Sequence, residues 1–200
     1  VHGGFGSSGP KFPQARRLRY LMAQSRWRED PAVDEAVRRT LDAMAAGGLY
    51  DQLGGGFHRY TVDRSWTVPH FEKMLYDNAE LLAVYSLAAD AYDDPEYERV
   101  AVGTAEALLG AFMDPDGGFY SSFDAQSEGA EGSYYVWTPE TLDEAVEDPD
   151  DAAIAGAFYG ITDGGNFEGK TVLTRRRSEA EVAEAVGGEG GGGAPAVERA

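Results

Sequence analysis

Residues 54–78, GGGFHRYTVDRSWTVPHFEKMLYDN, hold an unusual concentration of side chains that can transfer protons. His58 and His70 are two of the three histidines in the chain, and imidazole gains and loses a proton near neutral pH. Glu72 and Asp77 lie in the same segment and can act as acids or bases, or orient a histidine. A surface loop needs few such groups and a buried core excludes unpaired charges, so the segment predicts a functional site.

Each of these residues also has a purely structural interpretation. His58 and His70 can hydrogen-bond to loop carbonyl groups instead of reacting. Lys73 and Asp77, four positions apart, can form a modest ion pair on a helix. The two histidines lie twelve residues apart and lack the HExxH spacing of zinc-binding helices, so we predict no metal site and no cofactor.

The net charge of the chain excludes some classes of binding partner. Its 200 residues carry a formal net charge of −18, with 15 acidic and 12 basic residues in positions 1–100 but 20 and 5 in positions 101–200. This acidity argues against binding to nucleic acids or to anionic membrane surfaces. No apolar run approaches the ~20 residues that span a bilayer, and the N-terminal residues do not have the pattern of a signal peptide.

The chain contains no cysteine, which excludes disulfides, thiolate metal ligands and thiol redox chemistry within it. Acids are abundant, and the only lysines are Lys11, Lys73 and Lys170. This composition is typical of salt-adapted cytoplasmic proteins, and an acidic protein without salt adaptation is the alternative. We expect a cytoplasmic location. The first residue is Val1 rather than Met, which indicates a fragment of a longer protein.

Prolines that follow a helix-capping residue predict a mainly helical fold. An aspartate or threonine before a proline caps a helix and fills its first position. Such pairs occur at residues 30–31, 94–95, 138–139 and 148–149. Apolar residues that recur every three or four positions extend the pattern. The predicted helices span residues 13–27, 31–46, 69–92 and 95–112, and the predicted short strands span residues 57–62 and 134–137.

The helix predicted over residues 69–92 would position several of the reactive groups. His70, Lys73 and Asp77 lie at i, i+3 and i+7, so they would share one helix face. His70, at the helix start, would face a cleft. Because His70, Glu72 and Asp77 cannot all share one face, we expect at least one of them to be structural.

A Gly-Gly-aromatic element recurs along the chain. Its copies begin at residues 2, 53, 116 and 163, and the separations of 51, 63 and 47 residues suit a helical hairpin with its loop. Repeats of this period predict stacked antiparallel helical hairpins whose glycine-rich loops lie on a common rim. Residues 187–200 are glycine-rich, and we predict that they form a flexible linker.

Three long motifs resemble successive segments of one protein family. They read GGFGSSGPKFP, GGLYDQLGGGFHRYTVDRSWTVPHFEKMLYDNAELL and GGFYSSFDAQSEGAEGSYYVWT. Residues 1–178 resemble the thioredoxin-domain-containing proteins whose animal members are called spermatogenesis-associated thioredoxin-like proteins. The resemblance implies a thioredoxin-like domain before Val1, followed by a toroid similar to the N-acylglucosamine 2-epimerases and six-hairpin glycosidases.

The resemblance implies an all-α fold. Residues 1–186 are expected to form a partial (α/α)6 toroid of antiparallel helical hairpins with short β segments in the loops. Toroids of this kind bind sugars in a central cleft, where Arg59 would hold a carboxylate or a pair of hydroxyl groups. Aromatic rings and loop acids would complete the substrate-binding set, which consists of Tyr60, Trp66, Tyr120, Asp124, Glu128 and Trp137. The alternatives are that Trp66 packs in the core and that the acids lie in a solvated loop.

Two functions of different classes remain open. The first is an enzyme that binds or converts a carbohydrate-like small molecule by acid–base chemistry. In an epimerase, one group removes a proton next to a carbonyl and a second returns a proton on the opposite face. His70 and His58 are the candidate catalytic residues, with Glu72 or Asp77 orienting them. The alternative is a non-catalytic scaffold or binding domain that serves its own upstream thioredoxin-like domain.

Overall fold

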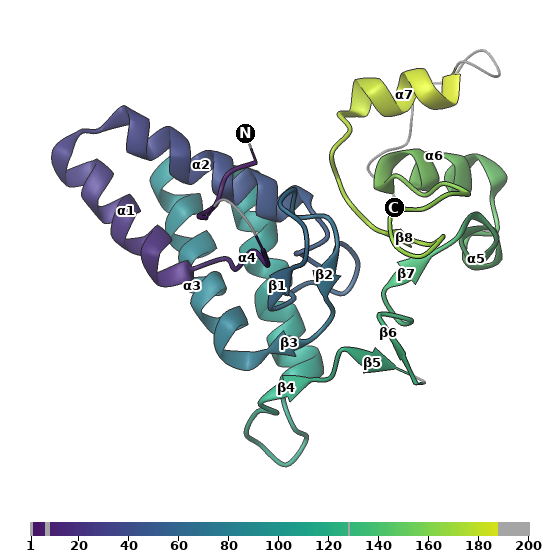
Figure 1. The fold of residues 1–200 in the computed structure, drawn as a ribbon, viewed down its shortest axis with the longest axis horizontal. Coiled ribbons are helices and arrows are strands. Elements are labelled where there is room, and N and C mark those ends of the chain that lie inside the picture. The colour runs from purple at the N-terminus through teal and green to yellow at the C-terminus, as the bar shows by residue number, and fades with distance from the viewer. Residues whose placement is uncertain (1, 7–8, 128, 188–200) are drawn as a thin grey trace. The chain divides into compact units, whose positions relative to one another are not determined.

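The computed structural model describes residues 2–6, 9–127 and 129–187, which belong to two compact units, Val1–Tyr134 and Tyr135–Ala200. Four long helices build the first unit (Figure 1): α1 Ala15–Arg28, α2 Pro31–Ala46, α3 Leu75–Tyr92 and α4 Pro95–Ala107. The π-helical turn η1, Leu108–Phe112, extends α4. The fold of the described chain is mainly helical, and its eight strands contain two residues each.

The helices of the first unit form two antiparallel hairpins that pack side by side (Figure 1). Helices α1 and α2 make one hairpin, and α3 and α4 make the other. Contacts between α1 and α3 and between α2 and α4 join the two pairs. The predicted arrangement of antiparallel hairpins is therefore confirmed within this unit.

An aspartate cap followed by a proline explains where several helices begin. Asp30 accepts hydrogen bonds from the backbone N–H groups of Ala32 and Val33 at the start of α2. Asp94 accepts one from Glu96 at the start of α4. Each side chain satisfies donors that have no partner within the helix, and the following proline has its φ already set for the first turn. The predicted starts at residues 31 and 95 are confirmed.

The predicted start of α3 at residue 69 is wrong. Residues 69–70 form strand β2, Pro69–His70, which pairs antiparallel with β1, Tyr60–Thr61. Strand β3, Lys73–Met74, pairs with β4, Ser122–Phe123, and α3 begins only at Leu75. Distant segments supply the backbone hydrogen-bond partners here, so the local apolar pattern does not decide the conformation. His70, Lys73 and Asp77 consequently do not share a helix face.

The core of the first unit unites all four helices with the loops at one end of the bundle. Leu18, Leu41, Val84 and Val100 come from α1 to α4 in turn, and all four are fully buried. Burying one such side chain contributes roughly 1.5–3 kcal/mol. Phe57, from the loop between α2 and α3, joins this cluster.

Two close contacts fix the glycine-rich loop against the helices. Gly55 has a φ of +70°, and a Cβ there would lie 2.3 Å from the carbonyl oxygen of Gly103 in α4. Asn78 in α3 accepts a hydrogen bond from the N–H of Phe57 at 2.6 Å and donates to the carbonyl of Phe57 at 2.9 Å. Glycine is therefore required at position 55 by both its backbone conformation and the close approach of α4.

The second unit contains α5, Pro139–Ala145, α6, Pro149–Tyr159, and α7, Glu179–Gly187. Its strands β7, Val136–Trp137, and β8, Thr171–Val172, pair antiparallel. The predicted strands near residues 57–62 and 134–137 are thus confirmed as β1 and β7. The remaining strands, β5 Gln126–Ser127 and β6 Ala130–Glu131, form a small hairpin in the first unit. Residues 188–200 of the predicted linker lie outside the described residues.

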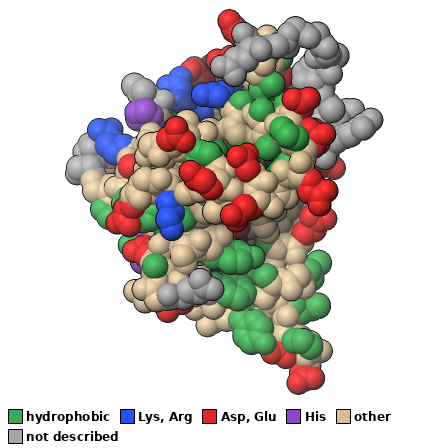
Figure 2. Space-filling model, turned by 90° about the vertical axis from the view of Figure 1, so that its right-hand side faces the viewer, with side chains coloured by type: hydrophobic (Ala, Val, Ile, Leu, Met, Phe, Trp, Pro, Cys, Tyr) green, Lys and Arg blue, Asp and Glu red, His purple; other side chains and the backbone are tan. Residues whose placement is uncertain are grey.

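Acidic side chains outnumber basic ones at the surface. Figure 2 shows many more acidic than basic side chains on the displayed face, in keeping with the net charge of −18. Among the described residues, no helix combines the length and apolar composition that a bilayer-spanning segment requires. The common rim of the Gly-Gly-aromatic loops stays a prediction, because the copies are divided between the two units.

Candidate functional site

Three of the predicted site residues meet beside the start of α3. Arg59 donates from Nη1 to Glu72 Oε2 at 3.0 Å, and its Nε lies 4.0 Å from Asp77 Oδ2. The backbone N–H of Arg59 also donates to the carbonyl of Glu72 at 2.9 Å. The pairing of these two segments therefore brings Arg59 and Glu72 to the first turn of α3, where Asp77 lies.

Asp77 borders a cavity of about 470 Å³. One side of the cavity is formed by the chain segment that enters α1, with Phe12 and Arg16, and the other by the first turns of α3, with Tyr76 and Glu80. The lining combines two carboxylates, two guanidinium groups and two aromatic rings. Polar groups and rings of this kind suit a small polyhydroxylated ligand.

Burial is the main cause that raises the pKa of Asp77 to about 6; the carboxylates of Glu80 and Glu72 contribute to the shift, and Arg59 opposes it. The buried Oδ2 atom has no hydrogen-bond partner within the described residues. Near neutral pH this carboxyl group therefore exists in both protonation states. A group with such a pKa can donate and accept a proton at physiological pH.

The raised pKa predicts how an uncharged substitute affects stability. Asp77 binds its proton more tightly in the folded than in the unfolded chain, so ionisation of Asp77 destabilises the fold as pH rises from about 4 through 6. Asp77→Asn is expected to raise the free energy of unfolding by about 1 kcal/mol at pH 8, allowing for solvent screening, and to leave it unchanged at pH 4. Urea denaturation at both pH values measures this difference. Asp143→Asn, an exposed change of equal charge in α5, is the matched control.

His70 lies on a partly exposed row of aromatic rings that leads to the cavity. Its ring stacks on Tyr60 with centroids 5.0 Å apart, and Tyr60 lies 4.7 Å from the ring of Phe12, which lines the cavity. His70 Nδ1 is 2.8 Å from Glu131 Oε1, and about a third of the His70 side chain is exposed. When Nδ1–H donates to Glu131, Nε2 is left to accept a proton from a ligand.

Glu131 is absent from the residues predicted from the sequence. It lies on β6, in the small hairpin that ends the first unit, and its contact with His70 spans 61 residues. The glycines that flank this acidic loop were the only local feature of the sequence that could have indicated Glu131. No spacing rule relates a carboxylate at that distance to a histidine.

His58 occupies a different environment from His70. Its ring is 2% exposed, and Nδ1 lies 3.1 Å from the carbonyl oxygen of Phe71. Burial, together with the nearby positive charge of Lys73, lowers the pKa of His58 to about 3. The imidazole is therefore neutral at physiological pH and enclosed, as in the structural alternative, and cannot exchange protons with a ligand in this conformation.

The other predicted binding residues do not gather around Asp77. Trp66 is fully buried in the core and donates from Nε1 to the carbonyl of His2 at 2.9 Å, so its ring cannot stack on a ligand. Tyr120 is exposed and hydrogen-bonds Asp114. Asp124 is exposed and accepts a hydrogen bond from the N–H of Gln126.

Two further predicted residues lie elsewhere. Trp137 belongs to the second unit, where it packs against the cluster around Leu142. Glu128 lies outside the described residues. Within the described part of the chain, no three His, Cys, Asp or Glu side chains lie close enough to share a metal ion.

Sequence comparison connects the chain to proteins of animals. It is 38% identical over 207 residues to spermatogenesis-associated protein 20 of Homo sapiens, an alignment that covers 88% of this chain. The chain is a homologue of spermatogenesis-associated protein 20. It spans about a quarter of that protein, since the alignment covers 26% of the human chain. No protein-family model matches the sequence.

Structural comparison identifies the fold. Cellobiose 2-epimerase from Spirochaeta thermophila DSM 6192 superimposes with a TM-score of 0.55 and 19% identity, over 98% of this chain and 60% of the epimerase. Cellobiose 2-epimerase from Bacillus thermoamylovorans B4167 gives the same TM-score with 12% identity, over 94% of this chain and 62% of the other. At these identities the likeness concerns the fold alone. It confirms the predicted partial (α/α)6 toroid of helical hairpins.

Proposed function

We propose that this homologue of spermatogenesis-associated protein 20 binds a carbohydrate-like small molecule beside α3 and exchanges protons with it. The observation that carries the proposal is Asp77, a partly buried carboxylate whose pKa is raised to about 6 and whose Oδ2 has no hydrogen-bond partner among the described residues. Perturbed acids that face a cavity are typical of catalytic sites. The fold shared with two cellobiose 2-epimerases agrees with a sugar-like ligand.

Two side chains at separate positions would carry out the proposed proton transfers. Asp77 would donate or remove a proton in the cavity, with the positive charge of Arg59 favouring its ionised form. His70, oriented by Glu131, would act at the other end of the aromatic row formed with Tyr60. The two groups would transfer protons at different atoms of one extended ligand. His58 has no part in this scheme.

Substitution of the two groups tests the proposal in the full-length protein. Turnover of a mixture of sugars and sugar phosphates would be followed by mass spectrometry. Asp77→Asn and His70→Gln are each expected to lower the rate by about 10²–10⁴-fold, because each removes one proton-transfer group. His70→Gln should change the thermal midpoint little and Asp77→Asn should raise it slightly, so unfolding would not account for the lower rates.

The matched control is Asp143→Asn, which makes the same change of charge on the exposed surface of α5. Undiminished turnover in Asp77→Asn would refute the role of Asp77. If the unmodified protein neither retains nor converts any compound, the scaffold function toward an upstream thioredoxin-like domain is favoured instead. Most of the human relative lies outside the region that aligns with this chain, and this motivates the alternative.

A further inference from the structure

Helix α1 buries one side in the bundle and carries aromatic rings on the other. Leu18 and Met22 lie on the buried side. Tyr20, Ala23 and Trp27 lie at i, i+3 and i+7, so they share the opposite side. Tyr20 is 64% exposed and Trp27 is 79% exposed. Aromatic rings that form one exposed stripe are typical of protein–protein interfaces.

Arginines border this aromatic stripe on both edges. Arg19 and Arg26 lie along one edge, and Arg17 and Arg28 lie along the other. Neither Arg19 nor Arg26 forms a salt bridge among the described residues. Helix α1 has five arginines and no acidic residue, whereas acidic residues outnumber basic ones in every other described α-helix. Its surface therefore suits an occupant that is apolar in the centre and acidic at the edges.

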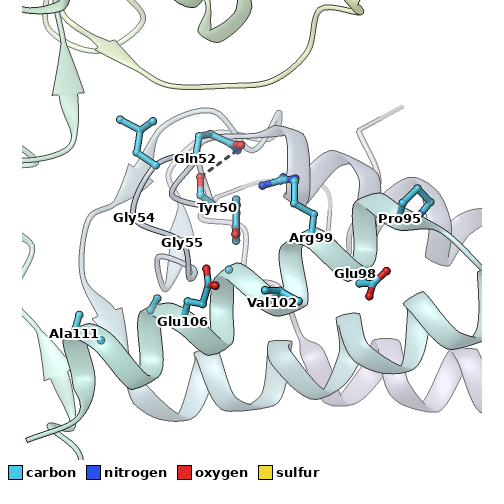
Figure 3. A pocket seen from close by; sticks show the side chains of 14 residues that line it. Tyr50, Gln52, Gly54, Gly55, Pro95, Glu98, Arg99, Val102, Glu106 and Ala111 are labelled. Carbon is cyan, nitrogen blue, oxygen red and sulfur yellow. Dashed lines mark hydrogen bonds between the residues drawn. The ribbon is translucent and has the colours of Figure 1, made fainter. Parts of the chain in front are cut away.

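A groove with these properties runs along α4 in the same unit. It is a cavity of about 670 Å³ between the outer side of α4 and the loop that follows α2 (Figure 3). Leu53 and Val102 give it exposed apolar surface. Glu98 and Glu106 border it on α4, on either side of Val102 along the helix. We call this region the α4 groove.

The acidic character of the α4 groove extends beyond this cavity. Glu98 and Val102 also line a neighbouring cavity of about 480 Å³, whose other acidic residues are Asp90, Asp93 and Asp94. Arg99, the single basic residue that lines either cavity, is paired with Glu96 at 2.7 Å. At the rise of an α-helix, the 14 residues of α1 extend about 21 Å, and residues 95–111 along the groove extend about 24 Å. The groove therefore matches α1 in charge and in length.

The α4 groove cannot receive α1 of its own chain. Helices α1 and α4 each pack against both α2 and α3, so they occupy opposite corners of the four-helix bundle. Their exposed sides consequently point away from the bundle in different directions. A second copy of the chain supplies the matching helix. Two α1 faces cannot pair with each other, because their arginines would repel one another.

We propose that copies of this chain associate head to tail, with α1 of one copy in the α4 groove of the next. Tyr20 and Trp27 would cover the apolar surface of the groove. The arginines beside them would form charge-assisted hydrogen bonds with Glu98 and Glu106. Such a contact joins two different faces, so repetition of the contact builds a ring or an open chain of copies. It is independent of the proton chemistry proposed for Asp77 and needs no ligand.

Sedimentation equilibrium of this chain over a series of concentrations, at physiological salt, tests the contact. Salt is needed because two chains of net charge −18 repel one another in dilute buffer. The average mass should exceed the 21.5 kDa of one chain and rise with concentration. Trp27→Ser and Val102→Arg should each weaken association by about 30-fold or more, the effect of losing one hot-spot contact. Both side chains are exposed, so circular dichroism should show unchanged helix content.

Mixing the two variants identifies which faces meet. Trp27→Ser keeps an intact α4 groove, and Val102→Arg keeps an intact α1 face. An equimolar mixture should therefore form a heterodimer that grows no further. A contact between identical faces could not be restored in this way.

Val62→Arg is the matched control, because it makes the same change at a valine that is 55% exposed, compared with 49% for Val102. It should alter the association constant by less than about twofold. Equal effects of Val62→Arg and Val102→Arg would overturn the proposal, because the change of charge alone would then account for them. A chain that stays monomeric at every concentration, or a mixture of the two variants that forms no heterodimer, would overturn it as well.

Discussion

Replacing Lys73 with methionine is expected to lower the free energy of unfolding by about 3–5 kcal/mol, the usual cost of removing one partner of a buried ion pair. Lys73 Nζ lies 2.7 Å from Asp51 Oδ2 and 2.9 Å from the carbonyl oxygen of Gly55, and both charged side chains are largely buried. The change would leave the Asp51 carboxylate without its counter-charge and release the glycine turn. Guanidinium denaturation of this chain measures the loss.

A double-mutant cycle separates the ion pair from the packing of the lysine stem. Asp51→Asn with Lys73→Met should cost less than the sum of the two single changes, since no uncompensated charge remains. Arg16→Met provides the exposed comparison, because the Arg16–Glu80 pair lies at the surface and should contribute much less to stability. If Lys73→Met cost no more than Arg16→Met, Lys73 would have no structural role in the glycine turn.

Lowering the pH from 7 to 4 is expected to remove as much as about 3 kcal/mol of stability through His58 alone. The folded-state pKa of His58 is lowered to about 3 from its usual value of 6.5. Below pH 6.5, His58 therefore binds a proton in the unfolded chain but stays neutral in the folded chain until the pH approaches 3. The stabilising contribution is complete above pH 6.5 and is lost progressively as the pH falls toward 3.

The His58→Gln variant isolates this effect, because glutamine retains a polar amide and does not titrate. The difference in unfolding free energy between the unmodified chain and His58→Gln should increase steadily from pH 4 to 6.5 and then stay constant. Both proteins should be compared in an Asp77→Asn background, since ionisation of Asp77 acts in the opposite direction over part of this range. Parallel pH profiles for the two proteins would show that His58 is accessible to protons in the fold.

The placement of the predicted site residues shows which inferences a local pattern supports. Arg59, Glu72 and Asp77 lie together beside the start of α3, whereas His70 contacts Glu131 from another loop. Residue type alone did not distinguish His70 from His58, although one ring is partly exposed and the other is enclosed. Burial is a property of the packed chain, and it also converts Asp77 from an ordinary surface acid into one with a raised pKa.

The sequence by itself determined the helices that begin with capping residues. It also determined the family to which the chain is related. The starts of α2 and α4 follow from Asp30-Pro31 and Asp94-Pro95, because a cap acts within one turn of the helix. Tertiary structure decided the conformation of residues 69–74, whose backbone pairs with strands from two other loops. It also decided the contact of His70 with Glu131 across 61 residues. Contacts between segments so far apart depend on how the hairpins pack, and no spacing within residues 54–78 encodes that packing.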